Sequence, residues 1–370
     1  MKRMTLFFAF LASLALTINA QEKLDDLLPI RGLCISAPQK DGLDEFIKFI
    51  KEELVPKNVN TLVLRVDWNY AYKSHPELRD EDPLTTEDVK KIIQTCRADG
   101  IKVIPQINLL GHQSWHGKVY ALLTEYPQFN ETPDVVMPAE GEYEWPNPDG
   151  LYCLSYCPLH PDVHKIVFDL VDEIVEVFES HAFHAGMDEV FYIGHEQCPR
   201  CHGRDKAELF AGEVTKIRDH LKKNKKDLWI WGDRLIDGKT TGIGLWSASM
   251  NNTHRAIDMI PKDVVINDWH YNRPNPTAAL FALKGFRVIS CPYRKAEVAK
   301  IQMHMMLGFR KYATPEIKEN YQGMMQTIWT SAENFLDYYY DRKQFDTESN
   351  RGNYVECFNT LFEEINKLEE

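Results

Sequence analysis

The sequence predicts a single-domain α/β protein folded as a (β/α)8 TIM barrel. Eight short apolar runs with the composition of buried strands are spaced along the chain, and helix-like amphipathic segments stand between them. Such regular alternation over roughly 340 residues is typical of a parallel barrel. A doubly wound open sheet is the alternative, but no glycine-rich phosphate-binding loop follows the first strand.

The predicted strands are runs rich in apolar and β-branched residues, each bounded by turn-forming or charged residues. In chain order they span residues 31–37, 61–68, 102–109, 183–190, 227–234, 264–271, 286–293 and 324–331. A long segment rich in Pro, Gly, Trp and Tyr, residues 110–159, follows the third strand and predicts an extended loop there.

Helix signals fill the intervals between these strands. Residues 43–54 have helical apolar spacing, and Thr85 caps a helix that Gly100 stops. Pro161 is expected to begin the next helix, which ends near Ser180. The remaining predicted helices span residues 206–222, 276–284, 296–307 and 354–368.

Composition limits the class of function. The formal net charge is -12, with 44% hydrophobic and 26% charged residues, which is ordinary for a globular enzyme. An acidic chain without a basic run is poorly suited to bind nucleic acid, so no nucleic-acid partner is expected.

The first twenty residues have the pattern of a secretory signal peptide. Lys2 and Arg3 precede an apolar run at residues 6–16, and Asn19-Ala20 offers a small-residue cleavage site. A membrane anchor is the alternative, but the run is too short to span a bilayer and no other long apolar run follows. We therefore expect residues 1–20 to be removed and residues 21–370 to form the barrel, periplasmic or secreted, with no stable membrane anchor.

Four of the eight cysteines cluster in the sequence, and this pattern leaves several hypotheses open. Cys153 and Cys157 could join Cys198 and Cys201 in a four-cysteine zinc site. Residues 198–202 (CPRCH) also match the spacing of a c-type haem attachment site. Disulfides or free thiols bracing long loops are the simpler interpretation, and we expect no cofactor.

Two adjacent carboxylates, Asp188 and Glu189, stand at the end of the fourth predicted strand. At the mouth of a barrel, where a strand bends into its loop, both side chains can reach one pocket. Buried carboxylates are costly unless they are paired or used, and two close together favour general acid chemistry. The structural alternative is a helix N-cap after the strand.

The other strand ends carry acids, amides and tryptophans. Because barrel active sites lie at the carboxyl ends of the strands, we expect these side chains to share one pocket. Carboxylates and amides bind sugar hydroxyls, and aromatic faces stack on sugar rings. For any single tryptophan, a place in the core is the alternative. The strand-end residues are Asp67, Trp68, Asn108, His112, Trp231, Asp233, Asp268, Trp269, Tyr293 and Trp329.

The acidic pair ends the stretch FHAGMDE, residues 183–189, in which a histidine and a glycine precede the two acids. This stretch resembles the His-x-Gly-x-Asp-Glu signature of the β-N-acetylhexosaminidases, glycoside hydrolase family 20. Residues 31–33 (RGL), 100–105 with Gly111-His112, and 326–330 (QTIWT) resemble its first, third and last strands, in the same order. The resemblance covers almost all of the barrel, and the small domain that usually precedes it is not expected here.

The resemblance implies roles for the site residues. Glu189 would be the general acid/base, and Asp188 would orient the substrate's 2-acetamido group, whose oxygen attacks the anomeric carbon with net retention. His112 and His184 would support Glu189, although a structural role suits His184 equally. The substrate-binding residues expected on this basis are Asp67, Asn108, His112, His184, Trp231, Asp233, Trp269, Tyr293 and Trp329.

The sequence departs from the family's pattern where sugar hydroxyls are usually bound. Gln39 stands where the family has an arginine, and Gln106 and Asn108 replace two acids. Ser331 replaces a glutamate, with Glu333 close by. The Tyr-x-Asp expected after the seventh strand is replaced by residues 292–295 (PYRK). Arg294 and Lys295 could face an acidic or sulfated sugar, although solvated loop charges are the simpler explanation.

The sequence therefore supports three hypotheses. The first is an exported retaining glycoside hydrolase that removes terminal β-linked N-acetylhexosamine from an oligosaccharide or glycoconjugate. The second is a non-catalytic carbohydrate-binding barrel. The third is a glycosidase for a sugar without an acetamido group, with Asp188 or Asp233 as nucleophile. The oligomeric state is left open.

Overall fold

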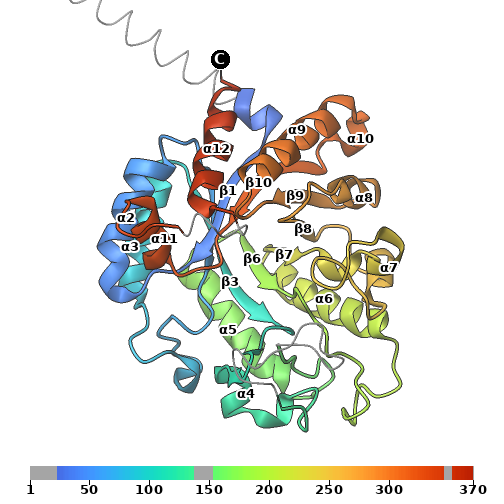
Figure 1. The fold of residues 1–370 in the computed structure, drawn as a ribbon. Coiled ribbons are helices and arrows are strands. Elements are labelled where there is room, and N and C mark those ends of the chain that lie inside the picture. Colours follow the sequence, from blue (N-terminus) through green and yellow to red (C-terminus); the bar gives the residue numbers. More distant parts are fainter. Residues whose placement is uncertain (1–22, 137–152, 346–351, 370) are drawn as a thin grey trace, which may run out of the picture.

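The computed structural model describes residues 23–136, 153–345 and 352–369, so the predicted signal peptide lies outside the described residues. Eight parallel strands close into a barrel with the neighbour order β1-β10-β9-β8-β7-β6-β3-β2 (Figure 1). All eight predicted strands are confirmed. They are β1 (Ile30–Ser36), β2 (Thr61–Arg65), β3 (Lys102–Leu109), β6 (Ala182–Gly186), β7 (Asp227–Trp231), β8 (Val265–Trp269), β9 (Arg287–Cys291) and β10 (Tyr321–Thr327).

Several strands end two to four residues earlier than their apolar runs predict. β2 ends at Arg65 and β6 at Gly186, because Asp67, Met187 and Glu189 have positive φ angles that leave the extended region. The acidic residues predicted at strand ends therefore lie in the first turns of the loops, where their side chains are not bound to the alternation of a strand.

Helices surround the strands and follow most of the predicted segments. The predicted capping box is present, with Thr85 and Asp88 exchanging backbone-to-side-chain hydrogen bonds of 3.0 and 3.2 Å. The helix after Pro161 begins two residues later than predicted, at Val163. The main helices are α2 (Leu43–Phe49), continued by a π-helical turn (Ile50–Leu54), α3 (Thr86–Ala98), α5 (Val163–Val177), α6 (Lys206–Lys223), α8 (Thr277–Leu283), α9 (Ala296–Tyr312), α11 (Ala332–Tyr339) and α12 (Tyr354–Asn366).

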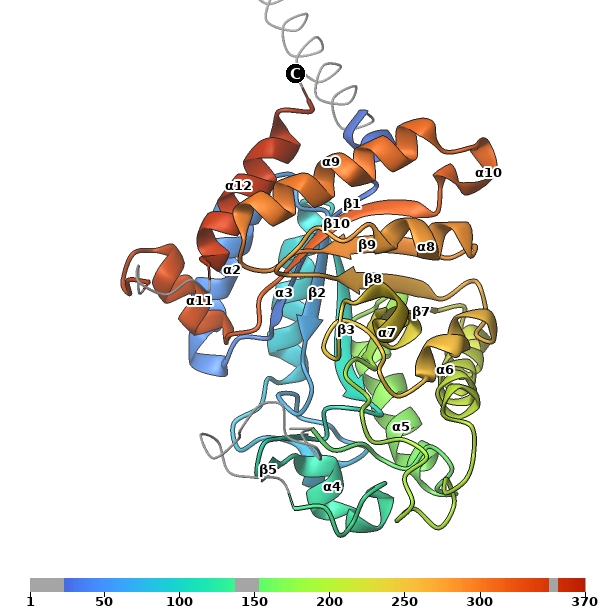
Figure 2. The same ribbon diagram turned by 45° about the vertical axis from the view of Figure 1, so that its right-hand side comes forward.

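The connection between β7 and β8 departs from the expected alternation. It carries only a 3-10 turn (Asp233–Leu235), the four-residue α7 (Gly238–Thr241) and a 3-10 segment (Thr253–Asp258). Further short elements are β4 (Ser114–Trp115) and β5 (Lys118–Val119), which form a hairpin, α4 (Ala121–Glu125) and α10 (Pro315–Lys318). Figure 2 shows β5 and α4 beyond the carboxyl end of β3, so this loop extends the mouth of the barrel.

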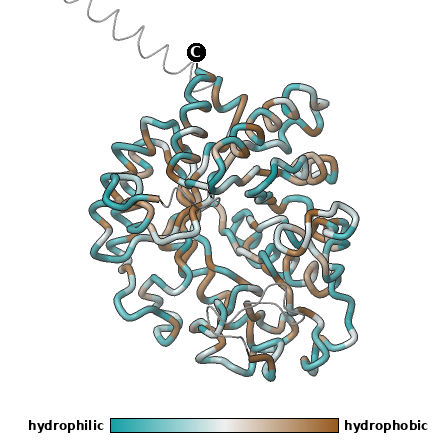
Figure 3. The backbone as a smooth tube through the Cα atoms, in the orientation of Figure 1, coloured by the Kyte–Doolittle hydropathy of each residue, from teal (hydrophilic) through white to brown (hydrophobic). Residues whose placement is uncertain are grey.

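The hydrophobic core has an inner and an outer part. Side chains inside the barrel form one cluster that includes Val63, Ile104, Trp229, Trp231 and Met325. A larger cluster fills the space between the strands and the helices. The most hydrophobic stretches accordingly lie in the strands at the centre of the molecule (Figure 3). Among the described residues, no helix is both long and apolar enough to cross a membrane.

Candidate active site

The turn after β6 brings Asp188 and Glu189 to the same side of the barrel. Gly186 has φ +65°, and a Cβ there would collide with the side chain of Asn108. Met187 and Glu189 also have positive φ, at 67° and 49°. These left-handed residues bend the chain so that both carboxylates line one pocket of about 1220 Å³. The adjacent acids thus face a single cavity, as the sequence predicts.

The turns around this pocket contain several strained backbone positions. Asp67, Leu110, His112, Met187 and Glu189 all have positive φ, although none is glycine. A non-glycine residue in this region costs roughly 1 kcal/mol or more and persists only where its surroundings hold it. Strain of this kind is characteristic of functional sites, and here it lies in the turns that follow β2, β3 and β6.

His112 lies between the two carboxylates. Its Nε2 is 3.2 Å from Asp188 Oδ2 and 3.1 Å from Glu189 Oε2. Burial alone would lower the pKa of His112, but the charge of Asp188 and hydrogen bonds to both carboxylates raise it well above its usual value. In turn, although burial opposes it, the charge of His112 holds the pKa of Asp188 below its usual range. We therefore assign His112 as an imidazolium that keeps Asp188 ionised.

Asp233 lies beneath the pocket and supports Glu189 from below. Its Oδ2 accepts hydrogen bonds from the Glu189 backbone N–H at 2.9 Å and from Arg234 Nε at 2.6 Å. Its Oδ1 accepts one from Trp269 Nε1 at 3.3 Å. Burial raises the pKa of Asp233 to about 6, against the opposing charge of Arg234. Asp233 is 1% exposed and does not line the pocket, so it positions Glu189 and does not face a substrate.

His184 and Trp231 also lie under the pocket floor, and neither lines it. Their rings are 4.5 Å apart, and Trp231 packs in turn against Trp329 at 5.6 Å. Burial lowers the pKa of His184 to about 3, and its Nδ1 accepts the Gly186 N–H at 3.0 Å. His184 is therefore a neutral ring that fixes the bend after β6, which is the structural role left open above.

Asp67 and Asn108 lie together on the β2–β3 side of the pocket. Asp67 Oδ1 accepts the backbone N–H of Asn108 at 2.8 Å, and burial raises the pKa of Asp67. Asn108 Oδ1 accepts a hydrogen bond from Gln106 Nε2 at 3.1 Å. The two amides that replace acids of the family pattern thus pair with each other, and only Asn108 reaches the pocket surface.

Aromatic side chains form the opposite wall. Trp269, Tyr271, Tyr293 and Trp329 all line the pocket. Trp329 Nε1 donates to Tyr271 Oη at 2.7 Å, and the ring of Tyr271 lies 4.9 Å from Trp269 and 5.3 Å from Tyr293. The linked rings make a stiff apolar wall opposite the carboxylates.

Some lining residues were not predicted. Arg65, the last residue of β2, donates to Ile328 O and Ser36 Oγ at 2.7 Å, and its guanidinium lies 4.7 Å over the ring of Trp329. The sequence did contain a signal for Arg65, because it is a lone arginine in an otherwise apolar strand, two residues before Asp67. Others come from connecting segments that give no such signal: Trp115, Lys118, Tyr120, Trp246 and Arg273. Arg294, which the sequence analysis considered as a contact to an acidic sugar, also lines the pocket.

The four clustered cysteines do not come together as the four-cysteine hypothesis requires. Cys157, Cys198 and Cys201 lie within reach of one another, with Glu131 as their fourth neighbour. Cys153 lies elsewhere, and its Sγ donates to the backbone carbonyl of Glu189 at 3.4 Å. The thiols of Cys198 and Cys201 are buried against Cys157, so they present no surface for a haem.

Comparison with known proteins agrees with this geometry. The chain is 27% identical over 165 residues to a β-hexosaminidase of Akkermansia muciniphila, an alignment covering 41% of this chain and 30% of the relative. It is 24% identical over 304 residues to β-hexosaminidase 1 of Coccidioides posadasii, covering 71% of this chain and 43% of the relative. The chain thus spans less than half the length of these curated relatives.

The fold is also shared with solved structures. The chitobiase of Flavobacterium johnsoniae superposes with a TM-score of 0.63 at 18% identity, covering 92% of this chain and 51% of the other. A family model, glycosyl hydrolase family 20 catalytic domain, matches residues 66–339, which include the acidic pair and the barrel strands from β3 to β10. The chain therefore belongs to glycosyl hydrolase family 20.

Proposed function

We propose that this chain is an exported, retaining glycoside hydrolase that removes terminal β-linked N-acetylhexosamine by substrate-assisted catalysis. The observation that carries the proposal is the pair Asp188 and Glu189, which share one pocket and one histidine, His112. Export rests on the signal pattern of residues 1–20. The curated relatives, named β-hexosaminidases, support the substrate class.

In the first step, Glu189 donates its proton to the leaving glycosidic oxygen while the substrate's acetamido oxygen attacks the anomeric carbon. The acetamide thereby becomes a cyclic oxazolinium, and Asp188 accepts a hydrogen bond from its N–H and balances its charge. Asp188 suits this role because it lines the same pocket as Glu189 and carries a negative charge that His112 maintains. In the second step Glu189 takes a proton from water, which opens the ring from the face that the leaving group occupied. The attached nucleophile avoids much of the entropic cost of a bimolecular attack.

Two alternatives fit the geometry less well. Asp233 could serve as a nucleophile only if it faced the sugar, but it is held by Glu189, Arg234 and Trp269 beneath the pocket. A binding module has no use for a carboxyl group at the leaving-group position, nor for the strained turn that places Glu189 there. The third alternative, in which Asp188 acts as an enzymic nucleophile, is tested by the glycosides described below.

The basic side chains of the pocket bear on specificity. Arg65 and Arg294 both line it, whereas Lys295 does not. We propose that they replace the family's usual contacts to sugar hydroxyls, since Gln39 stands in place of the expected arginine. Because Arg65 covers a face of Trp329, a sugar would stack mainly on the remaining aromatic wall.

The decisive experiment uses nitrophenyl β-glycosides with and without a 2-acetamido group, together with mono-, di- and trifluoroacetamido analogues and a sulfated acetamido sugar. We expect turnover only of acetamido sugars, with rates that fall as fluorine weakens the acetamide oxygen as a nucleophile. Hydrolysis rates that do not change with the number of fluorine atoms would contradict substrate assistance, and so would turnover of sugars without the acetamido group. Glycan binding without turnover of any substrate would favour the non-catalytic barrel.

His112→Gln is expected to move the acidic limb of the kcat/KM profile to higher pH. In the native site His112 holds the pKa of Asp188 low, so the carboxylate stays ionised well into the acid range. A neutral glutamine removes that charge, burial then raises the pKa of Asp188, and activity is lost at a higher pH as the pH falls. Parallel pH profiles of both proteins test this, and an unmoved acidic limb would show that His112 does not control Asp188.

A further inference from the structure

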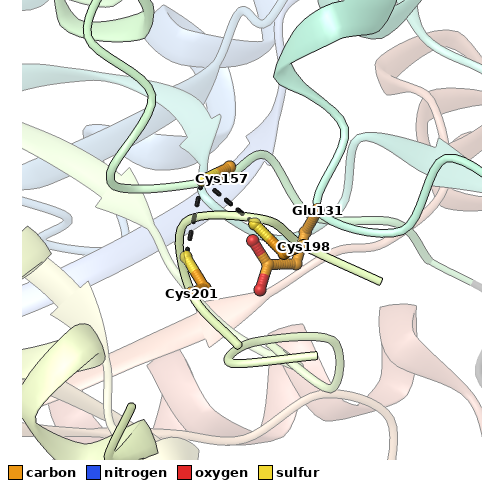
Figure 4. A group of neighbouring side chains, drawn as sticks. All are labelled: Glu131, Cys157, Cys198 and Cys201. Carbon is orange, nitrogen blue, oxygen red and sulfur yellow. Dashed lines mark hydrogen bonds between the residues drawn. The ribbon is translucent and has the colours of Figure 1, made fainter. Parts of the chain in front are cut away.

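A second cluster of reactive side chains lies outside the catalytic pocket. Glu131, Cys157, Cys198 and Cys201 come from three segments of the chain and point toward one another (Figure 4). The first two segments belong to the connection from β3 to α5, and the third follows β6. Their ligand atoms all lie within 4.8 Å of one another, and the Cys157 sulfur is 3.4 Å from those of Cys198 and Cys201. All four residues are at most 1% exposed, and none lines the catalytic pocket.

The backbone holds these segments in place. Glu131 N–H donates to Ser155 O at 3.0 Å, and Cys157 N–H donates to Phe129 O at 2.7 Å. The two cysteines that follow β6 sit in successive tight turns. Cys198 N–H donates to a carbonyl three residues earlier, and the Cys198 carbonyl accepts from His202 N–H at 3.0 Å. The cluster is therefore a built site and not a chance approach of surface side chains.

Glu131 indicates that the site takes a cation. Its Oε1 accepts the His195 N–H at 3.1 Å, whereas Oε2 is buried and accepts no hydrogen bond from any nitrogen or oxygen that the structure describes. A buried carboxylate oxygen that no N–H or O–H group satisfies costs on the order of 1–3 kcal/mol or more. This oxygen belongs to the carboxylate that faces the thiols, where a bound cation would satisfy it.

A disulfide does not account for the cluster. Three cysteines meet here, so any disulfide among them leaves one buried thiol beside Glu131. The fourth cysteine considered from the sequence, Cys153, is engaged with the backbone of Glu189 and does not enter the group. The odd number of thiols and the carboxylate instead match a four-ligand metal site.

The donor set points to zinc. Thiolates are soft ligands that select zinc over magnesium or calcium, and structural zinc sites use four protein ligands in a tetrahedron. With Zn–S bonds of about 2.3 Å, tetrahedral sulfurs lie about 3.8 Å apart. The observed 3.4 Å sulfur separations need only a few tenths of an ångström of expansion. Four buried protein ligands leave no open position for a reacting water, which indicates a structural role.

We propose that Glu131, Cys157, Cys198 and Cys201 bind one structural zinc ion that joins three segments of the chain at the carboxyl end of the barrel. Two short segments connect this site to the catalytic turn. One runs from Glu189 to Cys198, and the other from Cys157 back to Cys153, whose thiol contacts Glu189 O. The metal would thus restrain the loops that follow the catalytic residues without touching a substrate.

The test is the metal content of the full chain, purified without added metal and measured by mass spectrometry of the elements. We expect about one zinc per chain, with Cys201→Ser and Glu131→Gln each losing most of it and showing a lower Tm. Cys357→Ser, at a buried cysteine of α12, is the matched control and should retain its zinc. Equal zinc content in Cys201→Ser and the native protein would show adventitious binding and overturn the proposal.

A second measurement covers the case in which the variants fail to fold. Cobalt added to the folded, zinc-stripped native chain should give thiolate-to-metal charge-transfer absorption and the intense visible bands of tetrahedral cobalt. Absence of both bands in folded protein would contradict the site. A mass two hydrogens below the reduced value, in protein that holds no zinc, would show a disulfide instead. Both readouts are independent of glycosidase activity.

Discussion

Glu189→Gln is expected to lower kcat/KM by about 10²–10⁴-fold for glycosides whose leaving group is a poor acid, such as an alkyl or sugar alcohol. Glutamine keeps the shape of the side chain and can still contact His112, but it cannot deliver a proton to the leaving oxygen. Nitrophenyl glycosides should lose much less, because a nitrophenolate departs with little protonation. Glu189 is 7% exposed, so bulk water has little access to the site and cannot readily take over its role as proton donor.

The measurement compares kcat/KM for the two leaving-group classes in native enzyme and variant. Glu213→Gln is a matched control, because Glu213 is also a buried glutamate but binds Tyr156 and His164 away from the pocket. It should leave the ratio between the two substrates unchanged, even where it lowers stability. An equal loss on both substrates in Glu189→Gln would remove Glu189 from the role of acid.

The eight strands were predictable because barrel strands are apolar runs that contrast with the amphipathic helices around them. The ends of β2 and β6 could not be predicted. Asp67, Met187 and Glu189 leave the extended region with positive φ angles, which non-glycine residues rarely have. The structure of the connection from β7 to β8 could not be predicted either. Its chain winds through short turns whose shape depends on the buried Arg234, which binds the carbonyls of residues 245, 246 and 248.

Some residues of the candidate site could likewise be predicted from the sequence, and others could not. Asp188 and Glu189 could be found because they end an apolar run, and the pocket position of Asp67, Asn108, Trp269, Tyr293 and Trp329 follows from strand ends alone. The exchange of Cys153 for Glu131 in the thiol cluster could not be foreseen. Glu131 belongs to no spacing pattern with the cysteine pairs, and only the folding of the connection from β3 to α5 brings it to the thiols.

Asp188→Asn is expected to reduce kcat for acetamido sugars by about 100-fold or more, with a smaller change in KM. In the proposed reaction the acetamide must be held with its oxygen below the anomeric carbon, and its nitrogen becomes positively charged as the ring closes. Asparagine can still bond the N–H through its oxygen, but it supplies no negative charge. The variant therefore binds the ground state nearly as well and loses stabilisation of the transition state.

Binding of a stable thiazoline analogue of the cyclised intermediate distinguishes two effects of Asp188→Asn. One is the loss of the contact that orients the acetamide, and the other is general damage to the pocket. We expect Asp188→Asn to weaken binding of this analogue far more than binding of the free N-acetyl sugar, because only the intermediate carries the developing charge. Asp80→Asn, which changes another acid of the pocket lining, should alter the two affinities in similar proportion. If Asp188→Asn also weakened both equally, Asp188 would be a general binding residue. If a sugar without the acetamido group were turned over and lost activity to the same extent, Asp188 would instead be an enzymic nucleophile, and the reaction would not be assisted by the substrate.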